Sequence, residues 1–278
     1  AGAGEVAGGL SIGVAVVDKN VKAAAENLWT ENLGLLVDAQ NTGSVLTTAN
    51  GVAGAGEVAL TGSASESMIT YTTDAHIGKE ATIFASRGAV SVNAKSRFTH
   101  VGEAAGVSGA GNVAGGLSND TTYIKNDTKA YIGKRAIVHA KYGIAVTADH
   151  TTDITSAVVA GGFAGTAAFN GGVGVNKLRE NVQAYVDDDA ILRVDAAQDT
   201  KGKATLVNVS AKNTTKLSSG NGGAAIGATA AGGGAAVTVN SIVKNTQAFM
   251  GKNVRVYNNW TKDNKLSITA NNNEDIYS

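Results

Sequence analysis

The sequence of 278 residues contains no cysteine and no proline. Without cysteine, the chain has no disulfide framework, no thiolate metal site and no cysteine nucleophile. Proline lacks the N–H group that a β-sheet ladder needs, and average usage of about 5% would give roughly a dozen prolines in a chain of this length. Their absence is typical of a backbone that pairs on both sides along most of its length.

Aromatic residues and excess charge of either sign are also scarce. Aromatic residues make up 5% of the chain and hydrophobic residues 43%, so we expect an interior of Ala, Val, Ile and Gly in closely stacked layers. The 23 basic and 23 acidic residues balance. Phosphate backbones require clustered basic side chains, so we expect no nucleic-acid partner. Residues 220–239 are weakly hydrophobic and too rich in glycine for a membrane helix, so we expect no transmembrane span.

A six-residue phrase occurs three times. It begins at Gly2, Gly54 and Gly109, with offsets of 52 (54 − 2) and 55 (109 − 54). A second series steps by 55, 54 and 64 residues, aligned on Ala75, Ala130, Ala184 and Ala248. A period of this size indicates a repeat protein in which each unit buries its apolar face against the next. The sequence predicts about five units of roughly 52–64 residues in a single repetitive segment, residues 1–278.

Both ends of the sequence fall inside a unit. The chain opens on the repeated phrase, and it closes on Asp275-Ile276 where an earlier unit has Asp153-Ile154. We interpret the sequence as a segment of a longer or processed polypeptide.

Apolar and polar residues alternate with a period of two between the glycines, as in residues 81–85 and 89–94. This pattern is typical of β-strands, and glycine-containing turns such as residues 78–80 separate the segments. We expect an all-β parallel β-helix in which two or three short strands complete a coil. Each unit would then hold two or three coils, and ten to fifteen coils would form a rod on the order of 50 to 70 Å long. The longer steps predict insertions around residues 195–205 and 220–234.

Two groups of residues resemble ligand sites. Residues 54–59 fit the dinucleotide pattern G-x-G-x-x-A, but no amphipathic helix follows, and tight packing at a coil corner explains the glycines. Asp187, Asp188 and Asp189 could hold Ca²⁺, but they stand where other units have a Gly-Lys turn, which favours a solvated turn. We therefore expect no cofactor and no metal.

The four histidines are spread over different units, and they have no metal-binding spacing: His76, His100, His139 and His150. His76 takes the place of Tyr131, Tyr185 and Phe249, which indicates an outward-facing aromatic position. No nucleophile-elbow pattern indicates a Ser-His-Asp triad. The glycosylation sequons carry little weight in a chain so rich in Asn and Thr: Asn119, Asn126, Asn208, Asn213 and Asn259.

A β-helical lyase or hydrolase that cleaves glycans is the catalytic alternative. It would need carboxylates that converge from neighbouring coils, and Asp149, Asp153 and the run 187–189 are the candidates. The units resemble one another closely, however, and only Trp29 and Trp260 could serve as tryptophan platforms for sugars. We expect no enzymatic activity and assign no catalytic residue.

Residues 109–138, with the string NDTKAYIGK at 126–134, resemble the repeats of large bacterial surface proteins. These are the filamentous-haemagglutinin-like and leukotoxin-type adhesins, exported by autotransporter or two-partner routes, and the similarity of repeat style covers nearly the whole chain. The resemblance implies a right-handed parallel β-helix and an extracellular or outer-membrane-attached location. It also implies adhesion to host cells, other bacteria or matrix, with no catalytic residues.

The leading hypothesis is a structural stalk or adhesive segment of a secreted bacterial surface adhesin. A self-assembling extracellular filament or surface-layer subunit, with end-to-end association of chains, is the first alternative. An ice- or crystal-binding solenoid would need outward threonines at regular spacing, and the threonines here are irregular.

Overall fold

The computed structural model describes residues 4–26, 28–31, 33–195, 205–258 and 265–278. Within these residues the chain forms β-strands, turns and short connections, and no helix. All strand pairs are parallel. The predicted all-β parallel β-helix is confirmed.

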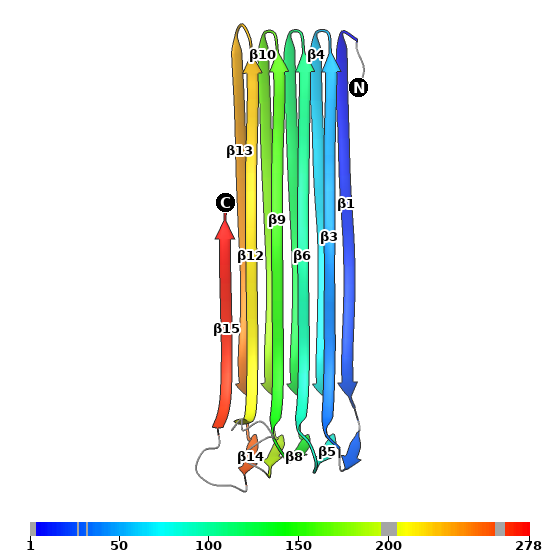
Figure 1. The fold of residues 1–278 in the computed structure, drawn as a ribbon, viewed down its shortest axis with the longest axis vertical. Helices are drawn as coiled ribbons and strands as arrows, with labels where there is room; N and C mark the ends of the chain where they lie inside the picture. Colours follow the sequence, from blue (N-terminus) through cyan, green and yellow to red (C-terminus); the bar gives the residue numbers. More distant parts are fainter. Residues whose placement is uncertain (1–3, 27, 32, 196–204, 259–264) are drawn as a thin grey trace.

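In the part of the chain that the structure describes, three parallel sheets of five strands make up the solenoid (Figure 1). Sheet A consists of β1 (Val6–Ala25), β4 (Val58–Ile77), β7 (Val113–Ile132), β10 (Ala167–Val186) and β13 (Ala231–Met250). Sheet B is short and consists of β2 (Trp29–Glu31), β5 (Thr82–Ala85), β8 (Ile137–Ala140), β11 (Ile191–Val194) and β14 (Arg255–Asn258). Sheet C consists of β3 (Leu35–Ala55), β6 (Val90–Ala110), β9 (Ile144–Ala164), β12 (Thr205–Gly227) and β15 (Lys265–Tyr277).

Each repeat unit forms one coil, with one strand in each sheet. The prediction of two or three coils per unit is therefore wrong. The glycines of the expected turns, such as Gly78 and Gly88, do lie between strands, but many other glycines lie inside the long strands, and at several of them atoms of the facing sheet leave no room for a Cβ. A Cβ on Gly102, for example, would lie 2.7 Å from an oxygen of Asp120. Segments that look like separate short strands thus join into strands of 20 or 21 residues.

The long dimension of the molecule follows the strands and not the stack. Twenty residues at about 3.3 Å per residue span about 66 Å, whereas five coils at about 4.8 Å span about 24 Å. Figure 1 shows the long strands of sheets A and C running side by side along this dimension. The predicted rod of 50 to 70 Å along the stack is therefore wrong in direction.

The two ends of the long strands differ. At one end, here called the tip, sheet C connects to sheet A through turns such as Gly56-Glu57 and Gly111-Asn112. At the other end, the corner end, sheet B joins sheet A to sheet C (Figure 1).

The predicted insertion near 195–205 falls mostly outside the described residues. The one near 220–234 is not an irregular insertion, because β12 and β13 stay in register there and only the tip turn lengthens, to 228–230 from 165–166 one coil earlier.

The interior alternates between apolar and polar layers along the strands. Near the corner end, small apolar residues from all three sheets form the largest cluster, and Ile69, Phe98 and Ile124 belong to a second one about halfway up. A fully buried Ile side chain such as Ile124 contributes about 1.5 to 3 kcal/mol. Between and above these clusters the buried residues are mostly Ser, Thr, Asn and single charged groups. The sequence prediction of an interior filled only by small apolar residues is correct for the corner end and misses the polar layers.

Candidate functional site at the corner end

A left-handed turn follows each of the last four strands of sheet A. The residues that adopt a positive φ, between 55° and 60°, are Glu80, Arg135, Asp189 and Asn253. This conformation costs a residue with a Cβ about 1 to 2 kcal/mol, and Asn and Asp tolerate it best. The turns stack, because the amide of Glu80 donates to the carbonyl of Lys134 (2.9 Å) and the amide of Arg135 donates to that of Asp188 (3.0 Å). The stacked backbone therefore fixes where the charged turn side chains emerge.

Charged side chains of the turns pair along the stack. Arg135 donates to Glu80 through Nε at 2.9 Å and through a second nitrogen, and Lys79 lies 3.6 Å from the same carboxylate. The Arg135 hydrogen bond lowers the pKa of Glu80. Lys134 lies 3.8 Å from a carboxylate oxygen of Asp188. All of these groups are substantially exposed, so each pair contributes little to stability.

An aromatic ladder borders the turns on the outer face of sheet A. His76, Tyr131, Tyr185 and Phe249 stack in register, with centroids 4.6, 4.9 and 5.0 Å apart and planes within 9° of parallel. The prediction that His76 takes an aromatic position is confirmed. Because each ring covers the face of the next, the edges of the rings point away from the sheet. The ladder therefore offers little of the open ring face on which a sugar stacks.

His76 is held between two carboxylates. Its Nε2 lies 3.1 Å from Glu26, and its Nδ1 contacts Asp74. Hydrogen bonds from Lys22 and from His76 lower the pKa of Glu26. Burial raises the pKa of the neighbouring Tyr131 to about 12. Glu26 is thus an anion and Tyr131 a neutral phenol at neutral pH.

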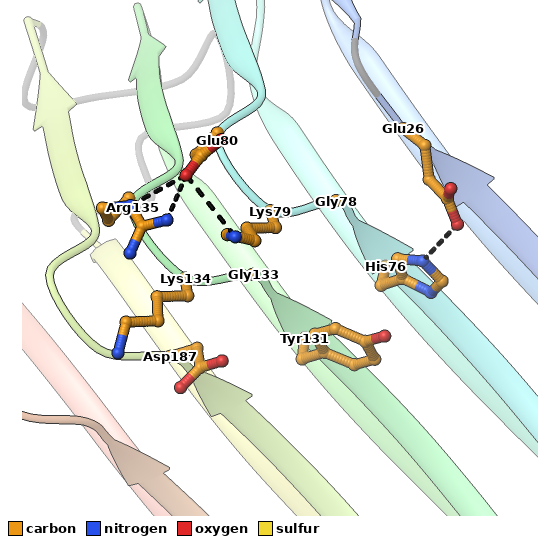
Figure 2. Close-up of a pocket in the computed structure, with 10 residues that line it drawn as sticks. All are labelled: Glu26, His76, Gly78, Lys79, Glu80, Tyr131, Gly133, Lys134, Arg135 and Asp187. Carbon is orange, nitrogen blue, oxygen red and sulfur yellow. Dashed lines mark hydrogen bonds and ion pairs between the residues drawn. The ribbon is translucent and has the colours of Figure 1, made fainter.

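Between the ladder and the turns lies a groove of about 770 Å³, shown in Figure 2. Its lining includes Glu26, His76, Tyr131, Lys134, Arg135 and Asp187. The carboxylates Glu26 and Glu80 both have lowered pKa values and cationic partners, so they are suited to ion pairing and not to donating a proton. Chemically, the groove presents paired charges of both signs and one aromatic edge, which suits weak binding of a polar surface or ligand.

The aspartates singled out in the sequence lie on different elements. Asp187, Asp188 and Asp189 form the turn after β10, as predicted, and Asp188 accepts a hydrogen bond from the amide of Lys252 (2.7 Å). Asp149 and Asp153 lie on β9 in sheet C, so the structure does not gather the two groups into one site. Within the described residues, no group of three or more His, Cys, Asp and Glu side chains could hold a metal ion.

The other three histidines lie in three separate environments. His100 is buried and hydrogen-bonds with Thr122 (2.9 Å), and burial lowers its pKa to about 4. His139 lies on β8 of sheet B, and its Nε2 is 2.6 Å from a carboxylate oxygen of Asp195. His150 is buried within 2.5 Å of the hydroxyl of Thr152. The repeated phrase at residues 54–59 forms the tip between β3 and β4, as its interpretation as a coil corner predicts.

Sequence reasoning missed a buried charged cluster around Glu180. This carboxylate is fully buried, accepts a hydrogen bond from Thr215 (2.7 Å), and lies 3.5 Å from His150 and 4.0 Å from Lys244. Burial alone would raise the pKa of Glu180, but the hydrogen bond and charge of His150, with Lys244, lower it overall. The only signal in the sequence is that Glu180 keeps the inward parity of Leu178 and Val182.

Comparisons of the chain with protein-family models, with curated proteins and with solved structures found no match. Among the described residues, no helix has the length and apolar character needed to cross a membrane. The fold itself defines the class: a parallel β-solenoid with one long three-sided coil per repeat.

Proposed function

We propose that the chain is a structural and adhesive segment of a secreted bacterial surface adhesin. The supporting observation is the strict register of equivalent residues across coils, which extends to side chains on the outer face. Asn245 donates to Asn181 (2.8 Å), and Gln183 donates to Gln247 (3.0 Å), each across 64 residues of sequence. A surface built this way places polar groups in rows at the coil spacing, so individually weak contacts add through multivalency.

The corner groove fits the same role. Glu26 and Glu80 in the groove are paired with cations and have lowered pKa values, which favours reversible contact with a polar surface over chemistry. The partners of such a segment are receptors on host cells, on other bacteria or in the matrix, and its location is the bacterial cell surface or the extracellular space.

Attachment of chain-coated beads tests this proposal. Beads that carry the 278-residue chain at increasing density are presented to epithelial cells, bacterial cells and matrix-coated slides, with albumin-coated beads as the control. We expect attachment that rises more steeply than density and that free chain inhibits poorly, because single contacts are weak. Attachment no greater than that of albumin beads at every density and on every surface would overturn the adhesive role.

A self-assembling filament is the second candidate, favoured by the strand order. β1 and β13 lie at opposite edges of sheet A, and each pairs with one strand of this chain. Unpaired edges of this kind accept further strands. Small-angle scattering over a concentration series tests filament assembly. If filaments form, the particle lengthens along the stack as concentration rises. A particle length that stays constant excludes filament assembly.

A further inference from the structure

The polarity of sheet A reverses toward the tip. In this half of the sheet the inward residues are Gly, Ala or small polar residues, as with Ser63 and Ser118, whose hydroxyls are 2.9 Å apart. The outward residues are apolar, and Leu10 and Leu117 are 76% and 72% exposed. We name the outward side chains of this region the apolar half-face: residues 6–14 of β1, 58–66 of β4, 113–121 of β7, 167–175 of β10 and 231–239 of β13.

The apolar half-face is almost free of polar groups. Glu66 is its only charged residue, and Asn119 and Thr121 are its only other polar ones. The face is also flat, because leucines lie over glycines of the next strand. A Cβ on Gly62 would be 3.1 Å from Leu10, and one on Gly115 would be 2.9 Å from Leu60.

A shallow apolar groove of about 480 Å³ crosses this face, and its lining includes Leu10, Ala64, Leu117, Val173 and Val237. These residues come from all five strands of sheet A. The apolar patch is therefore continuous from one edge of the sheet to the other, well beyond the scattered exposed side chains that are normal on a protein surface.

We propose that the apolar half-face packs against the same face of a second copy of this chain. Nine residues at about 3.3 Å and five strands at about 4.8 Å give a flat area of about 700 Å² per copy. Two copies would then bury about 1,400 Å², which is enough for a specific interface, and apolar character is typical of homodimers. Two flat sheets can pack about 10 Å apart face to face.

A lipid surface fits this face less well. The backbone edges of β1 and β13 would lie unpaired in hydrocarbon, where each unsatisfied polar group costs several kcal/mol. The tip also carries Glu5 and Glu57 in its turns. A second copy leaves the edges and the tip in water.

Charge decides the orientation of the two copies. The corner half of the same outer face carries ions of both signs, among them Lys125, Asp127, Lys129 and Arg179. Strands running antiparallel between copies overlap only the apolar half-faces and leave the charged halves solvated, whereas a parallel arrangement would bury those charges against each other. The inferred dimer is therefore antiparallel and staggered, with a twofold axis near the row of Leu10 and Leu117. It is distinct from the end-to-end association considered above and goes beyond the proposed adhesive function.

Sedimentation equilibrium of the full chain and two valine variants tests the surface. Val173→Glu places a charge on the apolar half-face, and Val159→Glu is the matched control on the outer face of sheet C. Both valines lie on inner strands of their sheets and are partly exposed, at 43% and 52%. We expect a dimer for the full chain, a dissociation constant raised at least tenfold by Val173→Glu, and no change in that constant with Val159→Glu. Circular dichroism and thermal melting verify that both variants fold.

Engineered cysteines test the orientation, because the chain has none of its own. Asn119→Cys lies two residues from the twofold axis, so its two copies would be about 17 Å apart across sheets packed about 10 Å apart. A flexible bismaleimide cross-linker of that reach should therefore link two copies. Lys129→Cys lies on the same strand twelve residues from Leu117, and its two copies would be about 80 Å apart in the antiparallel dimer. Linking through Lys129→Cys would overturn the antiparallel arrangement. Three results would overturn the dimer. The first is a monomer at all concentrations, and the second is an equal weakening of the dimer by Val159→Glu. The third is a monomer that floats with phosphatidylglycerol vesicles and no longer floats with them when it carries Val173→Glu.

Discussion

At the scale of single residues, the interior is unusual for its buried polar and charged groups. His100, Asp120, His150 and Glu180 are almost fully buried between two β-sheets, and neighbouring hydroxyls satisfy part of their hydrogen bonding. The period-two pattern of the sequence predicts which residues point inward. The pattern does not reveal that an inward polar residue is buried, because a polar residue that faces solvent fits the same alternation.

Removal of the charge of Glu180 should destabilise the fold. Glu180→Gln leaves Lys244 and His150 without their buried anion, at a cost of about 3 kcal/mol at pH 7. The folded pKa of Glu180 is lowered, so its stabilisation is present above the unfolded value of about 4.3 and disappears as pH falls through the lower folded pKa. Urea denaturation at pH 7 and pH 3 should show this difference shrinking in acid. Glu103→Gln, at an exposed outward position of sheet C, is the control, and equal stability of Glu180→Gln and wild type at pH 7 would refute the role of the cluster.

Asp120 should behave in the opposite way. Burial raises its pKa, while a hydrogen bond from Ser156 (2.5 Å) partly offsets that effect. A raised acid pKa means that the folded chain bears a cost once pH rises above the unfolded value of about 3.9, and that this cost grows until pH exceeds the raised folded pKa. Asp120→Asn should therefore raise the free energy of unfolding by about 1 kcal/mol at pH 7 and by nothing near pH 3. Asp18→Asn, at an exposed outward position, provides the comparison, and a destabilised Asp120→Asn at pH 7 would contradict the account.

At the scale of elements, the sequence predicts strands and turns more accurately than it predicts coils. The turns at Gly78-Lys79-Glu80 and Ser86-Arg87-Gly88, and the strands that follow each, lie where the alternation places them. The coil count is wrong because glycine has two uses here that look the same in sequence: it permits turns, and it makes room for a side chain from the facing sheet. Only the paired sheets show which use applies at Gly102 or Gly106.

The repeated phrase at the tip offers a matched test of glycine packing. A Cβ on Gly111 would lie 2.1 Å from the carbonyl oxygen of Gly56 in the preceding coil, whereas a Cβ on Gly109 would meet nothing within 4 Å. We expect Gly111→Ala to lower the free energy of unfolding by about 1 to 3 kcal/mol through overpacking, and Gly109→Ala to change it by less than about 0.5 kcal/mol. Thermal and urea unfolding measure both. Indistinguishable effects of the two variants would mean that the tips do not stack this closely.

At the scale of the whole molecule, the repeats determine the architecture. Offsets of 52 to 55 residues in the sequence correspond to the register of neighbouring coils, in which Val6, Val58 and Val113 are aligned in sheet A. The sequence therefore predicts parallel stacking of equivalent residues correctly. It does not predict the corner groove or the apolar half-face, because both arise from rows that run across coils and not along the chain.

The central claim is that one repeat makes one coil whose strands run the length of the molecule. The distance between spin labels at Glu57→Cys and Lys79→Cys, measured by pulsed electron paramagnetic resonance, tests it directly, because these positions flank β4 and no native cysteine interferes. A single 20-residue strand predicts a separation of about 65 Å. A separation below about 30 Å would mean that the unit folds into several short coils, and would contradict the structure described here.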